Sequence, residues 1–295
     1  MNESSSQHFG ASTQAIRAHY DLSNDFYRTW LDETMTYTAA LWDHNNPSDN
    51  LLLAQQRKID FAAQQIFTED TTSILDIGCG WGGALAHMQQ YFNLKNPVGI
   101  TISQAQYEWI KSKHSNVKVH LERWENYHTD EKYDGIISVE AIEAFVKPGM
   151  TSQAKIDIYR HLFKKCRYWL KDNGRFFLQC ICYENSFPKD LDEFIKNEIF
   201  PESDLPRLAE LAAGWEYLFE PVNIANHRLH YVQTLRAWLK NMRDNKENLV
   251  KEFGDSIYMR YLHYLKLSEY MFSNGNCSLL RITLQRINHS REEEK

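Results

Sequence analysis

Apolar residues between about positions 70 and 182 fall in short runs, and longer segments with helical periodicity separate these runs. The helical segments are expected at about 83–92, 103–113 and 151–171, the last of them ending at the turn sequence Lys171-Asp172-Asn173-Gly174. Strands that alternate with helices are typical of a parallel sheet flanked by helices. We therefore expect an α/β domain here, with strands at 73–77, 97–101, 117–121, 134–139 and 174–182.

The segments on either side of this alternation have a different pattern. The first 60 residues are rich in aromatic residues and helix formers, and the stretch 188–272 is expected to be mostly helical. Ser278 to Ile287 alternates apolar and polar residues, which predicts a late strand at the sheet edge. We expect one domain, 1–295, with an N-terminal helical cap (15–65), a cofactor-binding core (66–185), a helical substrate cap (186–275) and a final strand (276–290).

Composition narrows the possible partners. The chain has 295 residues, of which 43% are hydrophobic, and a net charge of −6, so no basic field attracts nucleic acid or an anionic membrane. No apolar run approaches the roughly 18 residues of an integral membrane segment, and the N-terminus lacks the pattern of a secretory signal. Five cysteines show no metal or disulfide spacing. We expect a cytoplasmic protein that acts on a small-molecule substrate, without a metal; a homodimer is a candidate assembly.

A glycine-rich loop offers a ligand site. The sequence Asp76-Ile77-Gly78-Cys79-Gly80-Trp81-Gly82-Gly83 follows a predicted strand and opens a helix, which suits a dinucleotide or a related ligand. A dinucleotide site also needs an acidic residue about 20 positions further on, and none occurs there before Glu108. S-adenosylmethionine instead presents a sulfonium and an ammonium group, which suit the carboxylate of Asp76. The sequence favours this cofactor over a nicotinamide; the alternative is that Asp76 and the glycines only form a turn.

Seven ordered segments resemble one known family. They lie at 19–27, 35–38, 75–83, 99–106, 133–143, 199–201 and 230–238. The family is that of the cyclopropane fatty acid synthase-like methyltransferases, which include mycolic acid-modifying enzymes and plant alkaloid N-methyltransferases such as coclaurine N-methyltransferase. The resemblance implies a Rossmann-like class I methyltransferase fold: a seven-stranded, mostly parallel sheet, with a helical cap from the N-terminal segment and from the region after the fifth strand.

The same resemblance implies which residues contact S-adenosylmethionine. Tyr37 and Thr38 would lie near its amino-acid end, and Thr101 and Gln106 near its ribose. The Arg123-Trp124-Glu125 segment looks like the family's W-E pair, which would place Trp124 and Glu125 by the adenine; alternatively they are a buried aromatic residue beside a surface acid. The glycine loop completes the set with Asp76, Gly78, Gly80 and Gly82.

Departures from the family pattern bear on the chemistry. Fatty-acid cyclopropanation in this family uses a bicarbonate held by a Cys, a Glu, a His and a Tyr, at positions that match Ala39, Glu143, Gln179 and Tyr231 here. Only the Glu and the Tyr are present, and a buried anion that lacks donors is unfavourable. The His that follows the glutamate in the family is Ala144. We therefore do not expect bicarbonate-assisted cyclopropanation.

Two carboxylates three residues apart supply an alternative. The segment Val139-Glu140-Ala141-Ile142-Glu143 resembles the V-E-x-x-E pattern of the plant amine methyltransferases. Such a carboxylate could accept a proton or stabilise positive charge on the acceptor. We expect Glu143 to have this role first and Glu140 second, since Glu140 could equally be a surface acid or a helix N-terminal charge. Tyr231 completes the expected catalytic set, and Tyr20 and Gln179 are expected to contact the substrate.

The sequence thus predicts an S-adenosylmethionine-dependent methyltransferase that methylates carbon or nitrogen of a small metabolite. A lipid-modifying methyltransferase or cyclopropane synthase that acts on unsaturated acyl chains is the second hypothesis. A cofactor-binding protein without catalysis is the third, because the family's cysteine and histidines are missing.

Overall fold

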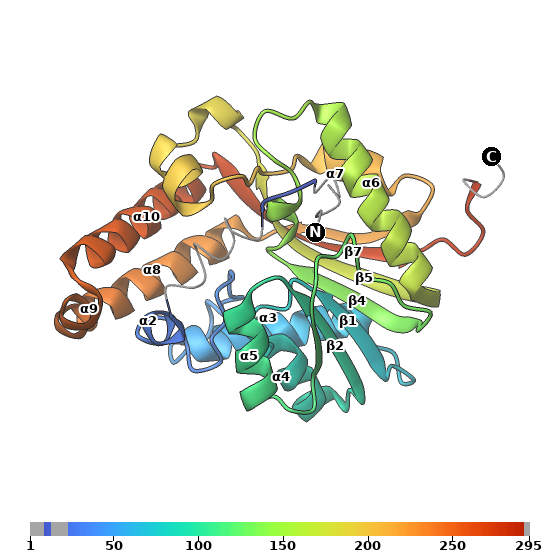
Figure 1. Ribbon diagram of the computed structural model, residues 1–295, viewed down its shortest axis with the longest axis horizontal. Coiled ribbons are helices and arrows are strands. Elements are labelled where there is room, and N and C mark those ends of the chain that lie inside the picture. The colour runs from blue at the N-terminus through green and yellow to red at the C-terminus, as the bar shows by residue number, and fades with distance from the viewer. Residues whose placement is uncertain (1–8, 13–22, 292–295) are drawn as a thin grey trace, which may run out of the picture.

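The computed structural model describes residues 9–12 and 23–291, and in them a seven-stranded sheet lies between two layers of helices (Figure 1). The strand order is β3-β2-β1-β4-β5-β7-β6; the first five strands are parallel, and β7 is antiparallel to β5 and β6. This architecture confirms the predicted fold. The strands are β1 (Ser73–Ile77), β2 (Asn96–Thr101), β3 (Lys118–Leu121), β4 (Tyr133–Val139), β5 (Leu170–Tyr183), β6 (Phe219–Asn226) and β7 (Cys277–Arg286).

The helices form two layers and a projecting cap. In Figure 1, α3, α4 and α5 lie below the sheet, α6 and α7 lie above it, and α8, α9 and α10 extend beyond one end of the sheet. The α-helices are α2 (Asn24–Arg28), α3 (Leu51–Ile66), α4 (Gly83–Phe92), α5 (Gln104–Lys113), α6 (Ser152–Trp169), α7 (Leu208–Trp215), α8 (Arg228–Asp244), α9 (Lys246–Phe253) and α10 (Asp255–Ser273). Three short turns add η1 (Ile142–Phe145), η2 (Pro188–Asp190) and the π-helical η3 (Ile195–Ile199).

The turn signal expected to end the long helix α6 has a different role. The helix ends at Trp169, and β5 begins directly at Leu170. Residues 171–174 form a bulge in β5, because Leu170 pairs with Tyr133 while Arg175 pairs with Gly135. Asn173 has φ 60°, a conformation that asparagine tolerates. The turn residues were therefore identified correctly, but they lie within a strand and do not separate helix α6 from strand β5.

Two strand predictions need correction in the region after β5. The stretch 188–272 is mostly helical, as expected, but it also contains β6, which was not predicted. As a result β7 is not at the sheet edge, because β6 pairs with its outer side. As an edge strand, β6 buries only Phe219 and exposes Val222 and Ile224, so it has no alternation of buried residues to reveal it. Pro221 fits this position, since proline is tolerated in edge strands.

The cap has its own hydrophobic cluster. Residues of α2, of the segment that follows it, of α8 and of α10 bury aromatic side chains against one another, with Trp30, Trp238 and Tyr261 almost fully buried. Tyr258 and Tyr264 are buried in the same cluster, whereas Tyr270 is 64% exposed. The helical spacing of these tyrosines thus mainly reflects core packing. Among the described residues, no helix combines the length and the apolar character that crossing a bilayer demands.

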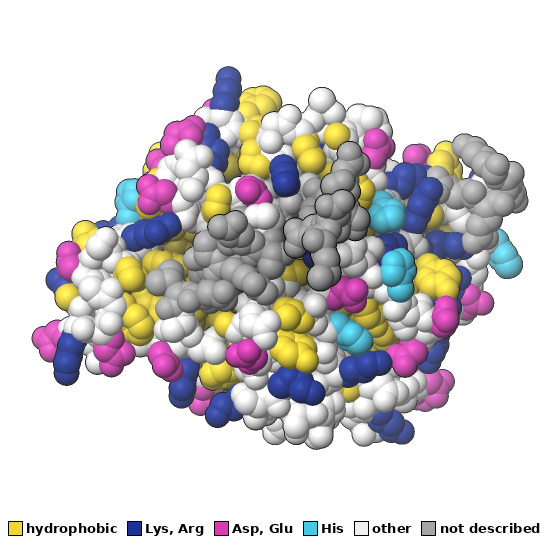
Figure 2. Space-filling view, viewed as in Figure 1, with side chains coloured by type: hydrophobic (Ala, Val, Ile, Leu, Met, Phe, Trp, Pro, Cys, Tyr) yellow, Lys and Arg dark blue, Asp and Glu magenta, His cyan; other side chains and the backbone are white. Residues whose placement is uncertain are grey.

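The visible surface carries charges of both signs. Figure 2 shows lysine and arginine side chains interspersed with aspartate and glutamate over this face. This mixture agrees with the small net charge of −6. A surface of this kind does not provide the continuous positive field on which phosphate-backbone binding depends.

Candidate active site

The glycine loop lies at the carboxyl end of β1, next to the point where the strand order reverses between β1 and β4. Ligands of open α/β sheets bind in the crevice at such a switch point. Gly78 has φ 83°, and a Cβ there would lie 2.4 Å from the Cβ of Ala141. Gly80 has φ 53°, and a Cβ there would meet nothing within 4 Å. The loop therefore packs closely on one side and leaves open space on the other.

The backbone of this loop is not arranged as a phosphate cradle. The N–H groups of Gly78 and Cys79 both donate to the carbonyl of Ile100, at 3.0 Å each. Donors that are committed to the neighbouring strand cannot bind a pyrophosphate. At the end of β2, the hydroxyl of Thr101 donates to Gln106 Oε1 at 2.7 Å, in the region where a dinucleotide site needs an acid. The geometry disfavours a nicotinamide cofactor, as the sequence predicts.

A cavity of about 180 Å³ opens beside the loop, and we call it the glycine-loop cavity. Four buried polar atoms of its lining have no hydrogen-bond partner among the described residues: Asp76 Oδ1, Arg123 Nε, Trp124 Nε1 and Glu125 Oε2. Buried polar atoms normally find partners, so these atoms indicate a place for a polar ligand. The predicted cofactor residues that line the cavity are Tyr37, Thr38, Asp76, Gly78, Gly80, Thr101, Gln106, Trp124 and Glu125.

Gly82 is the predicted cofactor residue that stands apart from this lining. It precedes α4 with φ 82°, and a Cβ there would meet the side chain of Ile110 at 2.9 Å. Its absent side chain therefore allows α4 to pack beside α5. Tyr20, predicted to contact the substrate, lies outside the described residues.

The electrostatics of the glycine-loop cavity centre on Asp76 and Lys58. Burial raises the pKa of Asp76 to about 7, although the nearby Lys58 opposes this shift. Burial lowers the pKa of Lys58 to about 8, and its ammonium group donates to Thr38 Oγ1 at 2.9 Å. The cavity thus offers a carboxyl group whose ionisation would be favoured by a cationic ligand.

Sequence reasoning did not identify Lys58, although a signal was available. Lys58 lies on the apolar stripe of α3, together with Leu51, Ala54, Ile59 and Ala62, and it is 2% exposed. A lysine in a buried stripe is rare unless it has a partner. Its position within the periodicity could therefore have marked it as a candidate site residue.

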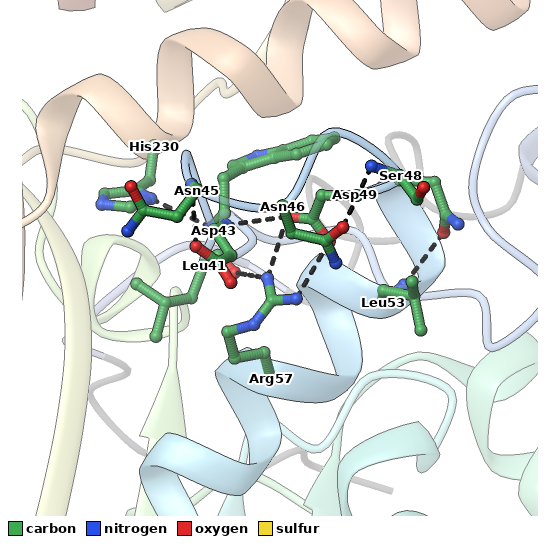
Figure 3. A network of polar contacts seen from close by, with 11 residues as sticks. Leu41, Asp43, Asn45, Asn46, Ser48, Asp49, Leu53, Arg57 and His230 are labelled. Carbon is green, nitrogen blue, oxygen red and sulfur yellow. Dashed lines mark hydrogen bonds and ion pairs between the residues drawn. The ribbon is translucent and has the colours of Figure 1, made fainter.

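The segment that carries Tyr37, Thr38 and Ala39 is fixed at both ends. Gln55 of α3 donates to the Thr38 carbonyl at 2.7 Å. Further along, Arg57 donates to the Leu41 carbonyl at 2.7 Å and to both carboxylate oxygens of Asp49 at 2.9 Å (Figure 3). The backbone N–H of Trp42 donates to His230 Nδ1 of α8 at 3.0 Å. This network holds the segment between α3 and the cap.

Glu140 follows β4 directly and is buried in a net of donors. Its Oε1 accepts hydrogen bonds from the Ala39 N–H at 2.8 Å and from Gln179 Nε2 at 2.7 Å, and its Oε2 accepts one from the Tyr231 hydroxyl at 2.8 Å. Burial raises the pKa of Glu140, while these hydrogen bonds and Lys58 oppose the rise. Its partners among the described residues are these three donors, which favour the ionised carboxylate. Its backbone φ of 52° shows that the site imposes an unusual conformation.

The donors to Glu140 occupy three of the four positions that the family resemblance assigns to bicarbonate. Residue 39 contributes its backbone N–H, which does not depend on a cysteine side chain, and Gln179 donates in place of a histidine. The expectation that this anion site has lost its donors therefore needs correction: the donors are present, and a carboxylate of the chain itself takes their hydrogen bonds. Gln179, expected to contact the substrate, is fully buried and lines neither of the two cavities described here.

Glu143, in η1, has the opposite surroundings. Its Oε1 accepts one hydrogen bond, from the N–H of Ile181 at 2.6 Å, and its buried Oε2 has no partner among the described residues. Burial, together with the charge of Glu140, raises the pKa of Glu143 to about 8. Glu143 is therefore protonated at neutral pH, while Glu140 carries the charge.

A second cavity of about 140 Å³ lies between η3, α8 and α10, and we call it the apolar cavity. Glu143 and Tyr231 are among the residues that line it. Tyr37, Glu140 and Ala144 line both cavities, so the two cavities meet at the Glu140 carboxylate. The apolar side chains of the lining include Ile181, Leu191, Ile195, Ile199, Phe200, Leu205, Met271 and Phe272.

Comparison with known proteins decides the family. A family described as mycolic acid cyclopropane synthetase matches residues 7–282. The chain belongs to this family. It is 32% identical over 286 residues to the S-adenosylmethionine-dependent methyltransferase UmaA of Mycobacterium tuberculosis, covering 90% of this chain and 94% of that protein. It is also 32% identical over 297 residues to cyclopropane mycolic acid synthase 2 of Mycobacterium leprae, covering 92% and 93%.

Solved structures support the same assignment. Mycolic acid cyclopropane synthase CmaA1, complexed with SAH and CTAB, has a TM-score of 0.82 and 27% identity, covering 94% of this chain and 99% of that one. Coclaurine N-methyltransferase has a TM-score of 0.76 at 21% identity, covering 95% and 84%, and shows the shared fold. The resemblance predicted from sequence is thus confirmed: the chain is an enzyme of an S-adenosylmethionine-dependent methyltransferase family, and this compound is its cofactor.

The glycine-loop cavity fits that cofactor in its donor and acceptor groups. Asp76 provides a carboxylate for a cationic ligand, and the orphaned atoms of Trp124 and Glu125 provide a donor and an acceptor for a heterocycle. Among the described residues, no cluster of histidine, cysteine or acidic side chains is arranged to hold a metal ion.

Proposed function

We propose that the enzyme transfers a methyl group to a nitrogen or an electron-rich carbon of an apolar small molecule held in the apolar cavity. The observation that carries this proposal is the position of Glu140, which lines both cavities and whose carboxylate accepts hydrogen bonds from three donors. S-adenosylmethionine supplies an electrophilic methyl group when bound. The protein's task is then to align the acceptor and to compensate the charge that develops on it.

The two glutamates divide this task. Glu140 provides a fixed negative charge where the cavities meet, which stabilises positive charge on the acceptor. Glu143 lines the apolar cavity, has an oxygen without a partner among the described residues, and has a pKa of about 8. Its protonated form orients the acceptor by donating a hydrogen bond, and its ionised form, which becomes populated near pH 8, takes up the proton that the acceptor releases. Neighbouring carboxyl groups with different pKa values commonly divide acid–base roles in this way. The ranking from sequence, with Glu143 first, becomes a division of roles, with Tyr231 holding Glu140.

For the cofactor, we propose contacts with the predicted residues that line the glycine-loop cavity. Asp76 compensates the positive charge of the ligand, and Tyr37 and Thr38 border its amino-acid end. Lys58 keeps Thr38 oriented through its hydrogen bond. Its positive charge favours the ionised forms of Asp76 and Glu140. Thr101 with Gln106 lies by the ribose, and Trp124 with Glu125 by the adenine.

A lipid-modifying activity is the second candidate, and two observations favour it. Relatives are named cyclopropane mycolic acid synthases, and the apolar cavity is lined by aliphatic side chains. Two other observations weigh against it. Glu140 takes the donors that an exogenous bicarbonate would need, and the stretch 189–198 beside the apolar cavity carries two lysines against four acidic residues. An anionic lipid surface would favour the opposite sign of charge.

The test is transfer of an isotopically labelled methyl group from S-adenosylmethionine to two panels of acceptors. One panel contains amines, phenols and prenyl compounds with apolar bodies; the other contains phospholipid vesicles with monounsaturated chains, with and without bicarbonate. We expect labelled product from the first panel and none from the second. Bicarbonate-dependent labelling of the vesicles would refute the proposal and establish the lipid activity.

A further inference from the structure

Arg281 is an arginine of β7 with no exposed surface, and the proposed function assigns it no role. Its Nε donates to Gln179 Oε1 at 2.7 Å, and one terminal nitrogen donates to the Ala39 and Ala40 carbonyls at 3.0 and 3.1 Å. The other terminal nitrogen donates to His227 Nδ1 at 2.9 Å. Burying a guanidinium group completely is costly unless its donors are satisfied, and here each of its nitrogens has an acceptor.

Arg281 fixes which way the Gln179 amide faces. An arginine can only donate, so the atom of Gln179 that it contacts must be the carbonyl oxygen. The amide nitrogen then points to Glu140 Oε1 at 2.7 Å and to the Ala39 carbonyl at 3.2 Å. A flipped amide would place its oxygen against the carboxylate and the carbonyl, and its N–H groups against the guanidinium. All of these contacts would be repulsive, so only one orientation is compatible with Arg281.

We propose that Arg281 is a positioning residue which, through Gln179, keeps the Glu140 carboxylate ionised and aimed at the junction of the two cavities. The proposal rests on the proposed function, because the role of Glu140 there gives the relay its purpose. Arg281 also holds the carbonyls of residues 39 and 40, so it fixes the backbone whose N–H is another donor to Glu140. One buried cation thus supports two of the three hydrogen bonds to the carboxylate.

The charges that face Glu140 come from several elements. Lys58 of α3 and Arg281 of β7 are the cations, and Glu143 of η1 is a second carboxyl group. Tyr231 of α8 donates its hydroxyl, and the thiol of Cys180 in β5 lies nearby. Burial lowers the pKa of Arg281 to about 10, so it stays charged at neutral pH.

His227 beside Arg281 adds no charge to this group. Its Nδ1 faces an arginine nitrogen and must therefore accept. Burial and the charge of Arg281 lower the pKa of His227 to about 4. The imidazole is neutral at neutral pH, and the positive charge behind Gln179 belongs to Arg281.

The experiment follows the ionisation of Glu140 directly. Protein labelled with ¹³C at the glutamate carboxyl carbon is titrated by NMR, and the resonance of Glu140 is assigned by its absence in Glu140→Gln. We expect Arg281→Met to raise the titration midpoint of Glu140 by about one pH unit, which lowers its ionised fraction about tenfold below the midpoint. Arg281→Lys keeps the positive charge, so its Glu140 midpoint should lie between those of the wild type and Arg281→Met.

Arg167→Met is the matched control. Arg167 is 9% exposed and donates to the Ile287 and Asn288 carbonyls at 2.9 and 2.8 Å, away from both cavities. The Arg167→Met variant should have a lower melting temperature than the wild type and the same titration midpoint of Glu140. If Arg281→Met does not fold, Gln179→Leu interrupts the relay from its other end, and the same upward shift is expected.

An unchanged Glu140 midpoint in a folded Arg281→Met or Gln179→Leu variant would overturn the relay and leave Arg281 with a structural role alone. This readout needs no acceptor molecule. A shifted midpoint therefore supports the relay even if the acceptor panels give no product. In that case only the proposed function is refuted.

Discussion

The glycine-loop cavity and the apolar cavity meet at Glu140 but are built from different parts of the fold. The first is lined largely by the loops that follow β1, β2, β3 and β4. The second is lined by η3, α8 and α10, together with residues of the sheet end. A loop at a strand end is adjacent to its strand in sequence, so its chemistry forms a local motif. Helices that meet only in space leave no such motif.

The two cavities also differ in what they offer a ligand. Among the described residues, the glycine-loop cavity has orphaned polar atoms on Asp76, Arg123, Trp124 and Glu125, whereas the apolar cavity has one, on Glu143. Several fixed polar groups specify one ligand closely, but a mostly apolar cavity with few polar groups free to bind a ligand specifies a class. The comparison teaches that the cofactor is determined by the fold, while the acceptor depends on the helices that close over it.

The largest expected effect comes from filling the glycine-loop cavity. Gly80→Val places a side chain in space that the structure leaves open at this cavity, so binding of S-adenosylmethionine should disappear in calorimetry. Gly149→Val is the matched control, because Gly149 also has positive φ and nothing within 4 Å but lies outside both cavities. Both variants carry similar backbone strain. Equal loss of binding in both would show that strain, and not the filled cavity, is responsible.

The next effect tests the point where the cavities meet. Glu140→Gln removes the charge and turns an amide toward three donors, so the rate of methyl transfer in single-turnover experiments should fall on the order of 100-fold. The affinity for the cofactor should change far less, because Asp76 remains. A variant that transfers methyl groups at the wild-type rate would remove Glu140 from the chemistry.

A smaller effect is the pH dependence of cofactor binding in the glycine-loop cavity. The pKa of Asp76 is about 7 in the structure without ligand, and a cationic ligand binds its ionised form. Affinity for S-adenosylmethionine should therefore fall as the pH drops below 7, by up to about tenfold per pH unit. Calorimetry between pH 6 and 8 measures this dependence. In Asp76→Asn the dependence should be weaker; the same slope in both proteins would assign it to another group.

The same contrast explains how much could be predicted from the sequence. The strands β1 and β4, the glycine loop and the predicted residues around Trp124 were identifiable because short apolar runs and short motifs are local. Strand β6 was missed because an edge strand with only Phe219 buried has no alternation of buried residues, and its presence moved β7 inward from the expected edge.

Within the site, the sequence named both glutamates, and the family resemblance grouped positions 39, 143, 179 and 231, but neither predicted that three of these positions donate to Glu140. Glu140 depends on Ala39, Gln179 and Tyr231, which lie 101, 39 and 91 positions away along the chain. Arg281 is similarly distant from Gln179, by 102 positions. Contacts of such separation are set by the sheet order and by the docking of the cap. Local spacing therefore identified the carboxylates and left their ionisation states to the structure.

The last effect concerns the apolar cavity and is one of stability. Burial and Glu140 raise the pKa of Glu143 from 4.5 to about 8, so the folded protein holds a proton that the unfolded chain releases above pH 4.5. This contribution to stability is fully present below pH 4.5 and declines by roughly 1.4 kcal/mol for each pH unit up to about 8. Glu143→Gln cannot ionise and avoids the decline.

The difference between the melting temperatures of Glu143→Gln and the wild type, measured by calorimetry without ligands, should therefore change in favour of the variant as the pH rises from 5 to 8. Above pH 8 this difference should stay constant. Glu193→Gln is the control, because that carboxylate is exposed on the surface. A constant difference between Glu143→Gln and wild type over this range would mean that Glu143 ionises in the folded protein as readily as in the unfolded chain. The apolar cavity would then hold two charged carboxylates, and the division of roles between Glu140 and Glu143 would fail.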